Sequence, residues 1–259
     1  MVASQRFRRA FPISADAVSF FRANGYVLLR DVVSPESIEK ITAAIIGLQG
    51  SRDSGEIARA KPDHNVWQRS QAIYDFIFCG QLGSIGSQLL GCSGTRLIHD
   101  AVFVKNGCSK ATPWHRDSDF WSFEGKGALT AWIPLQPTTA SMALRYVPGS
   151  HRQNSRLLRK YEKALVSLKC QVANEPLALG DVAIHHFQTL HGSMQYSGPV
   201  VRRSLAIHMI DADAHVGQAS NEFQNSHNTS CQWNTLRTGE RFPDDIAPRL
   251  YSSPTLHRA

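Results

Sequence analysis

The sequence predicts a mainly β domain with flanking helices. Helical spacing of apolar residues dominates the first ninety of the 259 residues. From about residue 95, short apolar runs alternate with turn residues, which is typical of an antiparallel barrel or sandwich. Hydrophobic residues make up 42% of the chain, enough for one substantial core. We therefore expect a single domain over 1–259, with a mainly helical part over 1–94 and a β body over 95–211.

Capping residues mark the first elements. Ser14 is placed to cap a short helix that Gly25 ends, because a serine oxygen accepts from free helix N–H groups and glycine tolerates the left-handed conformation. The β-branched and aliphatic run 26–33 follows and predicts a strand. Ser34 as N-cap and Pro35 at the first helical position then predict the start of a second helix.

Apolar residues at helical spacing should form the buried faces of the N-terminal helices. In the second helix these are Ile38, Ile41, Ile45 and Leu48. Residues 49–65 are polar and predict a loop, and another helix is expected over 66–90. Its inward side chains should be Ile73, Phe76, Ile77 and Leu82.

The β body is predicted from short apolar runs bounded by turn residues. These runs are 95–105, 128–136, 143–150, 181–187 and 200–210. A more helical insert, near 155–168, interrupts them. The last stretch, 212–259, is polar with little periodicity, so it is either a tail or a cover over one mouth of the barrel.

Charge and cysteine content restrict the classes of partner and compartment. The net charge is +7, but the basic residues are spread along the chain without a nucleic-acid reader motif, so we expect no nucleic acid partner. A basic surface favours an anionic small substrate. The five cysteines lack a CxxC pair, which favours a reducing, cytoplasmic location. No apolar run is long enough to cross a bilayer, and oligomeric state is left open.

The stretch TPWHRDSDFW, at 112–121, contains the most specific chemical pattern. In a strand, His115 and Asp117 would project to the same face, and an imidazole with a carboxylate suits a divalent transition metal. A further histidine, His191, lies downstream at the far end of a predicted strand. The pair alone is weak support, whereas the three together match the facial triad of non-haem iron oxygenases.

An arginine lies where a hairpin would bring it to the same pocket. Arg202 is eleven residues after His191, beyond the turn SGP at 197–199. Its planar guanidinium suits a carboxylate ligand. Arg203 alternates with it, so a register shift of one residue would exchange their roles.

These segments, in this order, resemble the phytanoyl-CoA dioxygenase family of Fe(II)/2-oxoglutarate-dependent oxygenases. TPWHRDSDFW is similar to that family's TPWHQD segment, and LRYVPGSHR to its VIPGSHR turn. GDVAIHHFQTLHGS and VRRSLAIH resemble its histidine and arginine strands. The resemblance covers most of 14–210 and implies a double-stranded β-helix, the cupin-like jelly roll, as the core.

The resemblance also implies the roles of individual residues. His115, Asp117 and His191 would be the iron ligands. The residues that would contact the co-substrate 2-oxoglutarate are Arg202, Ser193, Trp132 and Lys105. The implied reaction uses O₂ and hydroxylates an unactivated carbon of a small organic substrate, with release of succinate and CO₂. Desaturation or cyclisation would use the same residues.

Three alternatives follow from the same residues. A non-catalytic jelly-roll protein that binds a ligand or metal would keep the scaffold, but it has no need of both the triad and Arg202. A zinc hydrolase would require a helical HExxH pattern that is absent. Related halogenases carry a small residue where this chain has Asp117, which disfavours that reaction.

Other polar and aromatic residues near these segments have a structural interpretation first. For His99, His185, His186 and His208 we expect hydrogen-bonded core positions, with one of His185 and His186 pointing inward. Asp119 is expected to face solvent or contact substrate and not the metal, and His151 is expected to be a turn residue. Trp114 and Trp121 either wall the pocket or fill the core. Met142 departs from the family pattern and is expected to alter a loop at the rim.

Overall fold

Two antiparallel sheets form the body of the protein in a computed structural model that describes residues 11–50, 62–107, 109–153 and 172–253. The major sheet has the order β1 (Tyr26–Leu29), β8 (Val182–His186), β6 (Ala128–Pro134), β10 (Arg202–Asp211), β3 (Gly94–Lys105) and β12 (Arg249–Ser252), with β2 (Asp63–His64) also paired to β3. The minor sheet is β4 (Thr112–His115), β9 (His191–Ser193) and β7 (Leu144–Tyr146). A small ribbon pairs β5 (Phe123–Glu124) with β11 (His215–Val216).

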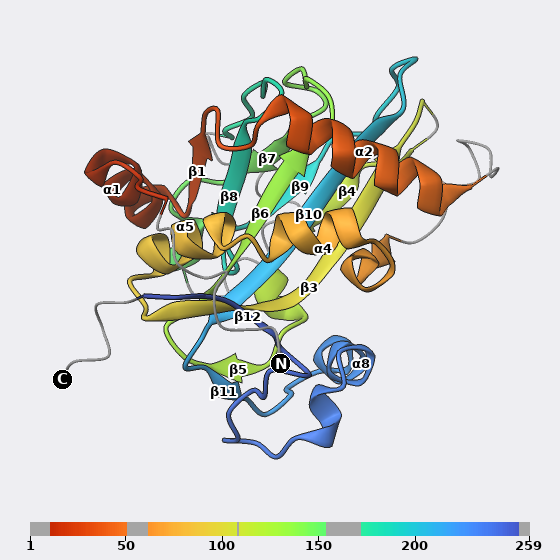
Figure 1. The fold of residues 1–259 in the computed structure, drawn as a ribbon. Coiled ribbons are helices and arrows are strands. Elements are labelled where there is room, and N and C mark those ends of the chain that lie inside the picture. The colour runs from red at the N-terminus through yellow and green to blue at the C-terminus, as the bar shows by residue number, and fades with distance from the viewer. Residues whose placement is uncertain (1–10, 51–61, 108, 154–171, 254–259) are drawn as a thin grey trace.

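Helices cover the face of the major sheet opposite the minor sheet (Figure 1). They are α1 (Ala15–Asn24), α2 (Pro35–Gln49), α4 (Gln71–Ile77) and α5 (Gln81–Leu90). A fifth helix, α8 (Glu222–Ser230), lies near the β5–β11 ribbon, away from the others. Short 3-10 turns are η1 (Val66–Arg69), η2 (Asp117–Asp119), η3 (Ser150–Arg152) and η4 (Trp233–Thr235).

Strand alternation divides the side chains of the major sheet between two cores. Leu129, Ala131 and Ile133 of β6 pack in the large core beneath the helices, as do the alternate residues of β8 and β10. Thr130 and Trp132 of the same strand are buried on the other face, toward the minor sheet. The barrel interior therefore receives a second, more polar set of side chains.

The predicted N-terminal caps are present. The Ser14 side chain accepts from the Ala17 N–H and the Ser34 side chain from the Ser37 N–H. Gly25 ends α1 with φ of 79°, in the left-handed region. A Cβ at Gly25 would also lie 2.4 Å from Thr189 Oγ1, so this glycine permits a close approach between α1 and the segment that precedes β9.

Two predicted elements differ from the structure. The helix expected over 66–90 is three pieces, η1, α4 and α5. Extended backbone at Ser70 separates η1 from α4, and Gly80, with φ of 88°, separates α4 from α5. The strand expected over 26–33 is limited to Tyr26–Leu29, since Asp31 has φ of 54°. The helical insert predicted near 155–168 lies outside the described residues.

The chain after residue 211 folds back on the barrel. Strand β12 pairs with β3 at the edge of the major sheet. Helix α8 is held to the loop after η2, where Gln224 donates to the Trp121 carbonyl at 3.2 Å and Asn228 donates to Ser122 Oγ at 2.9 Å. Residues 212–253, called the covering segment below, are therefore packed against the barrel, and a cover over its mouth stays a prediction.

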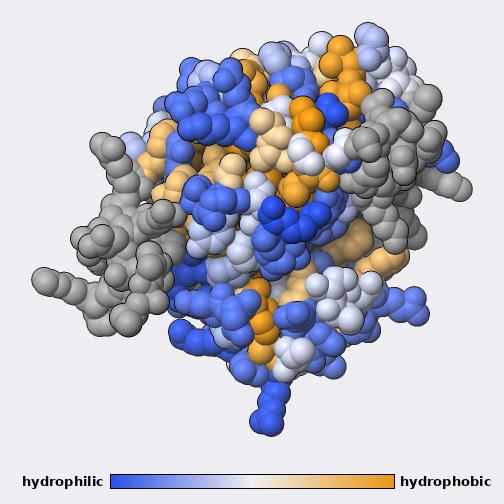
Figure 2. Space-filling view, turned by 45° about the vertical axis from the view of Figure 1, so that its right-hand side comes forward, coloured by the Kyte–Doolittle hydropathy of each residue, from blue (hydrophilic) through white to orange (hydrophobic). Residues whose placement is uncertain are grey.

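Hydrophobic side chains on the face seen in Figure 2 lie in separate groups among hydrophilic ones. Exposed large apolar residues include Phe20, Ile46, Val200 and Phe223, which belong to different parts of the chain. Within the described residues, no helix combines the length and the apolar content that crossing a bilayer requires.

Candidate metal centre

His115, Asp117 and His191 meet between the two sheets. Their ligand atoms all lie within 4.8 Å of one another. Nε2 of His191 is 3.7 Å from Asp117 Oδ1, and Nε2 of His115 is 4.0 Å from the same oxygen. His191 and Asp117 are buried, and His115 is partly exposed. One ion could therefore contact all three side chains from a position open on the His115 side.

The pair His115 and Asp117 converges through a turn, which corrects the prediction from strand alternation. Strand β4 ends at His115, and Asp117 begins the 3-10 turn η2. The turn is held from both sides, since the Ser118 N–H donates to the Phe187 carbonyl at 3.0 Å and the Arg116 guanidinium donates to the Ser150 carbonyl at 2.7 Å.

Strand pairing and backbone hydrogen bonds orient both imidazoles. His115 and His191 are directly opposite in the β4–β9 ladder, and β9 is a short strand of its own after β8, not the far end of one strand as predicted. Nδ1 of His115 lies 2.9 Å from the Pro113 carbonyl, and Nδ1 of His191 lies 2.9 Å from the Thr189 carbonyl. A carbonyl only accepts, so Nδ1 carries the proton and each Nε2 lone pair is free for a metal.

Asp117 is held in its ionised form with one oxygen committed to the protein. Thr130 donates its hydroxyl to Asp117 Oδ2 at 2.7 Å, and His185 Nε2 lies 3.3 Å from that oxygen. Burial opposes the charge, but His191 and His185 hold the pKa of Asp117 well below its usual range. Burial is also the main cause that lowers the pKa of His191 well below its usual range. Oδ1 is thus the free carboxylate oxygen, facing the two imidazoles.

A hydrogen-bonded chain extends from Asp117 into β10. Because the Thr130 hydroxyl donates to the carboxylate, it accepts from His208 Nδ1 at 2.8 Å. His185, the inward member of the His185–His186 pair, is 1% exposed. Sequence reasoning gave His185 and His208 core positions and missed Thr130. The available signal for Thr130 was its place two residues before Trp132, on the same face of one strand.

The predicted co-substrate residues lie together beside β9. Lys105 donates to Ser193 Oγ at 2.6 Å, and Ser193 donates to Thr112 Oγ1 at 2.8 Å. Arg202 pairs with Lys105 in the β10–β3 ladder, and its guanidinium carbon is 5.4 Å from the centroid of the Trp132 ring. Burial, with a contribution from Arg202, lowers the pKa of Lys105 to about 8.

The two neighbouring arginines point in different directions. Arg202 is 3% exposed, and its Nη1 donates to the Met142 carbonyl at 2.8 Å while its Nε has no hydrogen-bond partner among the described residues. Arg203 Nε donates to Gln49 Oε1 at 3.2 Å, on the helical side of the sheet. The register therefore directs Arg202 into the barrel. It also brings Met142, the residue that departs from the family pattern, into contact with this arginine.

The remaining side chains singled out in the sequence lie outside the triad. Trp114 is under the Arg145 guanidinium, 5.0 Å from its ring centroid, and His151 Nε2 lies 3.2 Å from the Arg22 carbonyl. Asp119 is partly exposed, and its carbonyl accepts from Asn221 Nδ2 at 3.4 Å. Trp121 is buried against His99 and His208. The structure brings none of these into the group of three ligand atoms.

A family model for phytanoyl-CoA dioxygenase (PhyH) matches residues 21–204, well over half of the chain. The chain belongs to the phytanoyl-CoA dioxygenase family. A curated relative, "Phytanoyl-CoA dioxygenase 1" of Oryza sativa subsp. japonica, is 20% identical over 254 residues, which cover 78% of this chain and 90% of the relative.

Solved structures share the fold. The non-haem α-ketoglutarate-dependent carbocyclase SnoK from nogalamycin biosynthesis matches with a TM-score of 0.75 and 22% identity, over 92% of this chain and 96% of its own. The epimerase SnoN from the same biosynthesis matches with a TM-score of 0.75 and 22% identity, over 91% of this chain and 97% of its own. EctD from S. alaskensis matches with a TM-score of 0.66 and 18% identity, over 89% of this chain and 86% of its own. The jelly-roll prediction is confirmed.

Membership of the phytanoyl-CoA dioxygenase family identifies the chemistry of this chain as that of an Fe(II)- and 2-oxoglutarate-dependent oxygenase. The donor set agrees with that chemistry. Two neutral imidazoles and one carboxylate are the facial ligands that non-haem Fe(II) takes, with the remaining coordination positions open.

Proposed function

We propose that this protein hydroxylates an unactivated carbon of a small organic substrate, while 2-oxoglutarate is converted to succinate and CO₂. His115, Asp117 and His191 hold the Fe(II) in this proposal. The observation that carries it is a pair of buried cations, Lys105 at the end of β3 and Arg202 at the start of β10, which lie opposite each other in the major sheet. In the described part of the chain, no carboxylate forms an ion pair with either of them.

Two adjacent buried cations require an anion, because each desolvated charge is costly without a partner. Burial lowers the pKa of Arg202 to about 10, and the group that opposes this shift is the Tyr196 phenol, not a carboxylate. The far carboxylate of 2-oxoglutarate is the partner that fits. It can accept from the Arg202 fork, from Lys105 and from the hydroxyls of Ser193 and Thr112. The Trp132 ring beneath the guanidinium would keep this end of the pocket dry.

The protein's own residues then supply orientation and exclusion of water. Fe(II), when bound, supplies the oxygen activation that couples decarboxylation of the keto acid to oxidation of the substrate carbon. Thr130 and His185 hold Asp117 so that Oδ1 faces the ion. The carbonyls of Pro113 and Thr189 fix the two imidazole planes. Ligands held in this way lose little orientational freedom when iron binds.

The similar structures support a small-molecule substrate. One SnoN structure is a complex with Fe³⁺, α-ketoglutarate and nogalamycin RO, and the EctD structure contains 2-oxoglutarate and 5-hydroxyectoine. The net charge of +7 favours an anionic substrate in this chain. A jelly-roll protein that only binds a ligand is the competing function, and it would have no use for a keto-acid pocket beside an iron triad.

Anaerobic titration tests the assignment. The apo-protein receives Fe(II) and then 2-oxoglutarate, and the visible charge-transfer band of the chelated keto acid is followed. We expect the band in the parent protein and its loss in His115→Ala. In Arg202→Ala we expect 2-oxoglutarate affinity to fall about 10- to 150-fold, the range for losing charged hydrogen bonds.

Arg203→Ala is the matched control, because Arg203 is adjacent in the chain and faces Gln49. It should bind 2-oxoglutarate like the parent. If Arg203→Ala loses the co-substrate and Arg202→Ala does not, the assignment of the pocket is wrong. If iron binds and no band forms in the parent, the binding-protein alternative replaces the oxygenase.

A further inference from the structure

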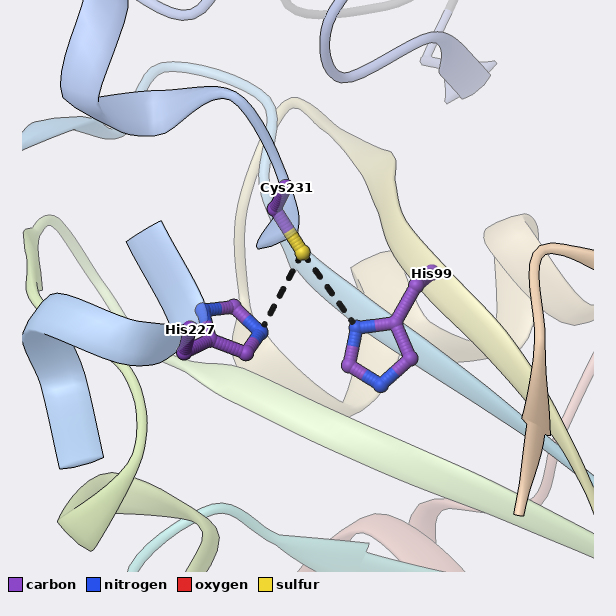
Figure 3. A group of neighbouring side chains, drawn as sticks. All are labelled: His99, His227 and Cys231. Carbon is purple, nitrogen blue, oxygen red and sulfur yellow. Dashed lines mark hydrogen bonds between the residues drawn. The ribbon is translucent and has the colours of Figure 1, made fainter. Parts of the chain in front are cut away.

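A second group of metal-ligating side chains lies between strand β3 and the C-terminal end of helix α8. It contains His99 of β3, His227 of α8 and Cys231, the residue that caps the C-terminal end of α8. Figure 3 shows both imidazoles turned toward the thiol. His227 Nε2 is 3.4 Å from Cys231 Sγ, and His99 Nδ1 is 3.9 Å from it. This group shares no residue with the triad.

The arrangement has the dimensions of a tetrahedral metal site. The three ligand atoms all lie within 4.8 Å of one another. Zinc bonds of about 2.0–2.1 Å to nitrogen and 2.3 Å to sulfur place such ligands roughly 3.3–3.6 Å apart. Both sulfur–nitrogen distances are within a few tenths of an ångström of that range. His227 and Cys231 are separated by four positions at the end of one helix, which brings both side chains to one face.

Both imidazoles are available as neutral donors. Burial is the main cause that lowers the pKa of His227 to about 4 and that of His99 well below its usual range. Burial raises the pKa of the Cys231 thiol to about 12, so the thiol keeps its proton until a cation replaces it. Metal binding would release that proton to solvent and form a thiolate ligand.

Two features of the surroundings indicate a ligand-binding group and not a packed core cluster. Among the described residues, the Cys231 thiol is the only hydrogen-bond partner of the His227 ring, so no other group competes for the Nε2 lone pair. A cavity of about 200 Å³ lies against Cys231 and is lined also by Asn65, Ile98 and Asp245. An ion could approach the sulfur from this cavity, and its fourth ligand would lie there.

We propose that His99, His227 and Cys231 form a second metal site, selective for a borderline transition ion of the zinc class, with a fourth position open to the cavity. Two imidazoles with one thiolate favour such an ion over the hard cations that carboxylates bind. The site would clamp α8 to β3, and thereby the covering segment to the barrel. It is independent of the proposed function, since neither the iron ligands nor the co-substrate residues take part.

Cobalt substitution tests the site. The metal-free protein is titrated with Co²⁺, and the near-ultraviolet thiolate-to-cobalt charge-transfer band is recorded, together with the metal bound at equilibrium. The triad has no sulfur, so Co²⁺ bound there produces no such band. We expect the band in the parent and in His115→Ala, and its loss in Cys231→Ser and in His227→Ala. Bound Co²⁺ should fall from two equivalents in the parent to one in each of these variants.

Cys79→Ser is the matched control, because Cys79 is an exposed free thiol in the turn between α4 and α5. It should keep the band. The Fe(II)–2-oxoglutarate band in Cys231→Ser shows that this variant is folded. A parent protein without the thiolate band, or a band that persists in Cys231→Ser, would overturn the proposal. Either outcome leaves the assignment of the iron centre untouched.

Discussion

The two histidine clusters of this protein differ in what holds their imidazoles. In the iron centre, the carbonyls of Pro113 and Thr189, each two residues before its histidine, fix the rings of His115 and His191. In the second cluster, the only hydrogen-bond partner of the His227 ring among the described residues is the Cys231 thiol, and its other neighbours are aromatic rings such as Trp233. The first cluster is therefore formed by two paired strands, whereas the second depends on how α8 packs against β3.

This difference shows two ways to position metal-ligating residues. Backbone pairing of adjacent strands can fix them, or the packing of a helix against a sheet can bring them together. The β4–β9 ladder sets the spacing of His115 and His191 through backbone hydrogen bonds, which side-chain changes elsewhere leave in place. The position of Cys231 depends on hydrogen bonds from Gln224 and Asn228 to the loop at 118–122. For this reason we expect substitutions and pH changes to affect ligand binding at one cluster without the same effect at the other.

Asp117→Ala should produce the largest difference between the two clusters in metal affinity. Loss of the only carboxylate in the triad should weaken Fe(II) binding by more than about 100-fold, beyond the 10–100-fold typical of outer residues. The thiolate-to-cobalt band should remain unchanged. Equilibrium dialysis with each metal measures both effects. Asp119→Ala is the control, since that side chain lies outside the triad, and equal loss of both sites in Asp117→Ala would contradict their independence.

A smaller effect on the iron centre is expected from Thr130→Val. The change removes the hydroxyl that donates to Asp117 Oδ2 and accepts from His208, so Fe(II) affinity should fall about 10- to 100-fold. Thr130→Ser keeps the hydroxyl and should restore binding to within a few-fold of the parent. Unchanged iron affinity in the valine variant would show that the strand backbone alone positions the carboxylate.

Ligand affinity at the co-substrate pocket and at the second cluster should change in opposite directions as the pH rises. The pKa of Lys105 is lowered to about 8, so its ammonium is lost as the pH rises through 8, and a carboxylate ligand binds the charged form. Affinity for 2-oxoglutarate should therefore fall by up to about fivefold between pH 8 and 9. Cobalt affinity at Cys231 should rise over this range, because the thiol, whose pKa is raised to about 12, must release a proton.

Calorimetric titration with 2-oxoglutarate at pH 7, 8 and 9 measures the first effect, and Lys105→Met is its control. That variant should bind weakly at each pH without the decline. If the parent protein binds 2-oxoglutarate with the same affinity at pH 7, 8 and 9, Lys105 does not contact the co-substrate.

The smallest effect is expected from Asn221→Ala at the start of α8. Asn221 caps the helix by accepting from the Gln224 N–H at 2.9 Å, and loss of such a cap costs about 1 kcal/mol. Cobalt affinity at the second cluster should fall by up to about fivefold, with no change in Fe(II) affinity. Asn225→Ala, in the exposed middle of the same helix, is the matched control. An effect on iron instead of cobalt would show that α8 supports the triad.

Much of the fold could be predicted because its signals are local. The caps at Ser14 and Ser34 act within one helical turn, and alternation along β6 divides the two cores without reference to other strands. The interruption at Gly80 was missed because apolar spacing continues on both sides of it. The triad was named from motifs, although the local reason given for His115 and Asp117, strand alternation, was wrong.

The sequence by itself determined the helix starts, the alternating strands and the family, because each depends on neighbouring residues or on short segments in order. It also predicted the three proposed iron ligands, which the structure brings together. Only the tertiary structure decided that Asp117 reaches the ligands through a turn, that Thr130 and His208 support it, and that Arg202 and not Arg203 faces Lys105. It alone brought Cys231 to His99, 132 positions apart. Such contacts depend on strand register and helix docking, which are set by packing across the whole barrel.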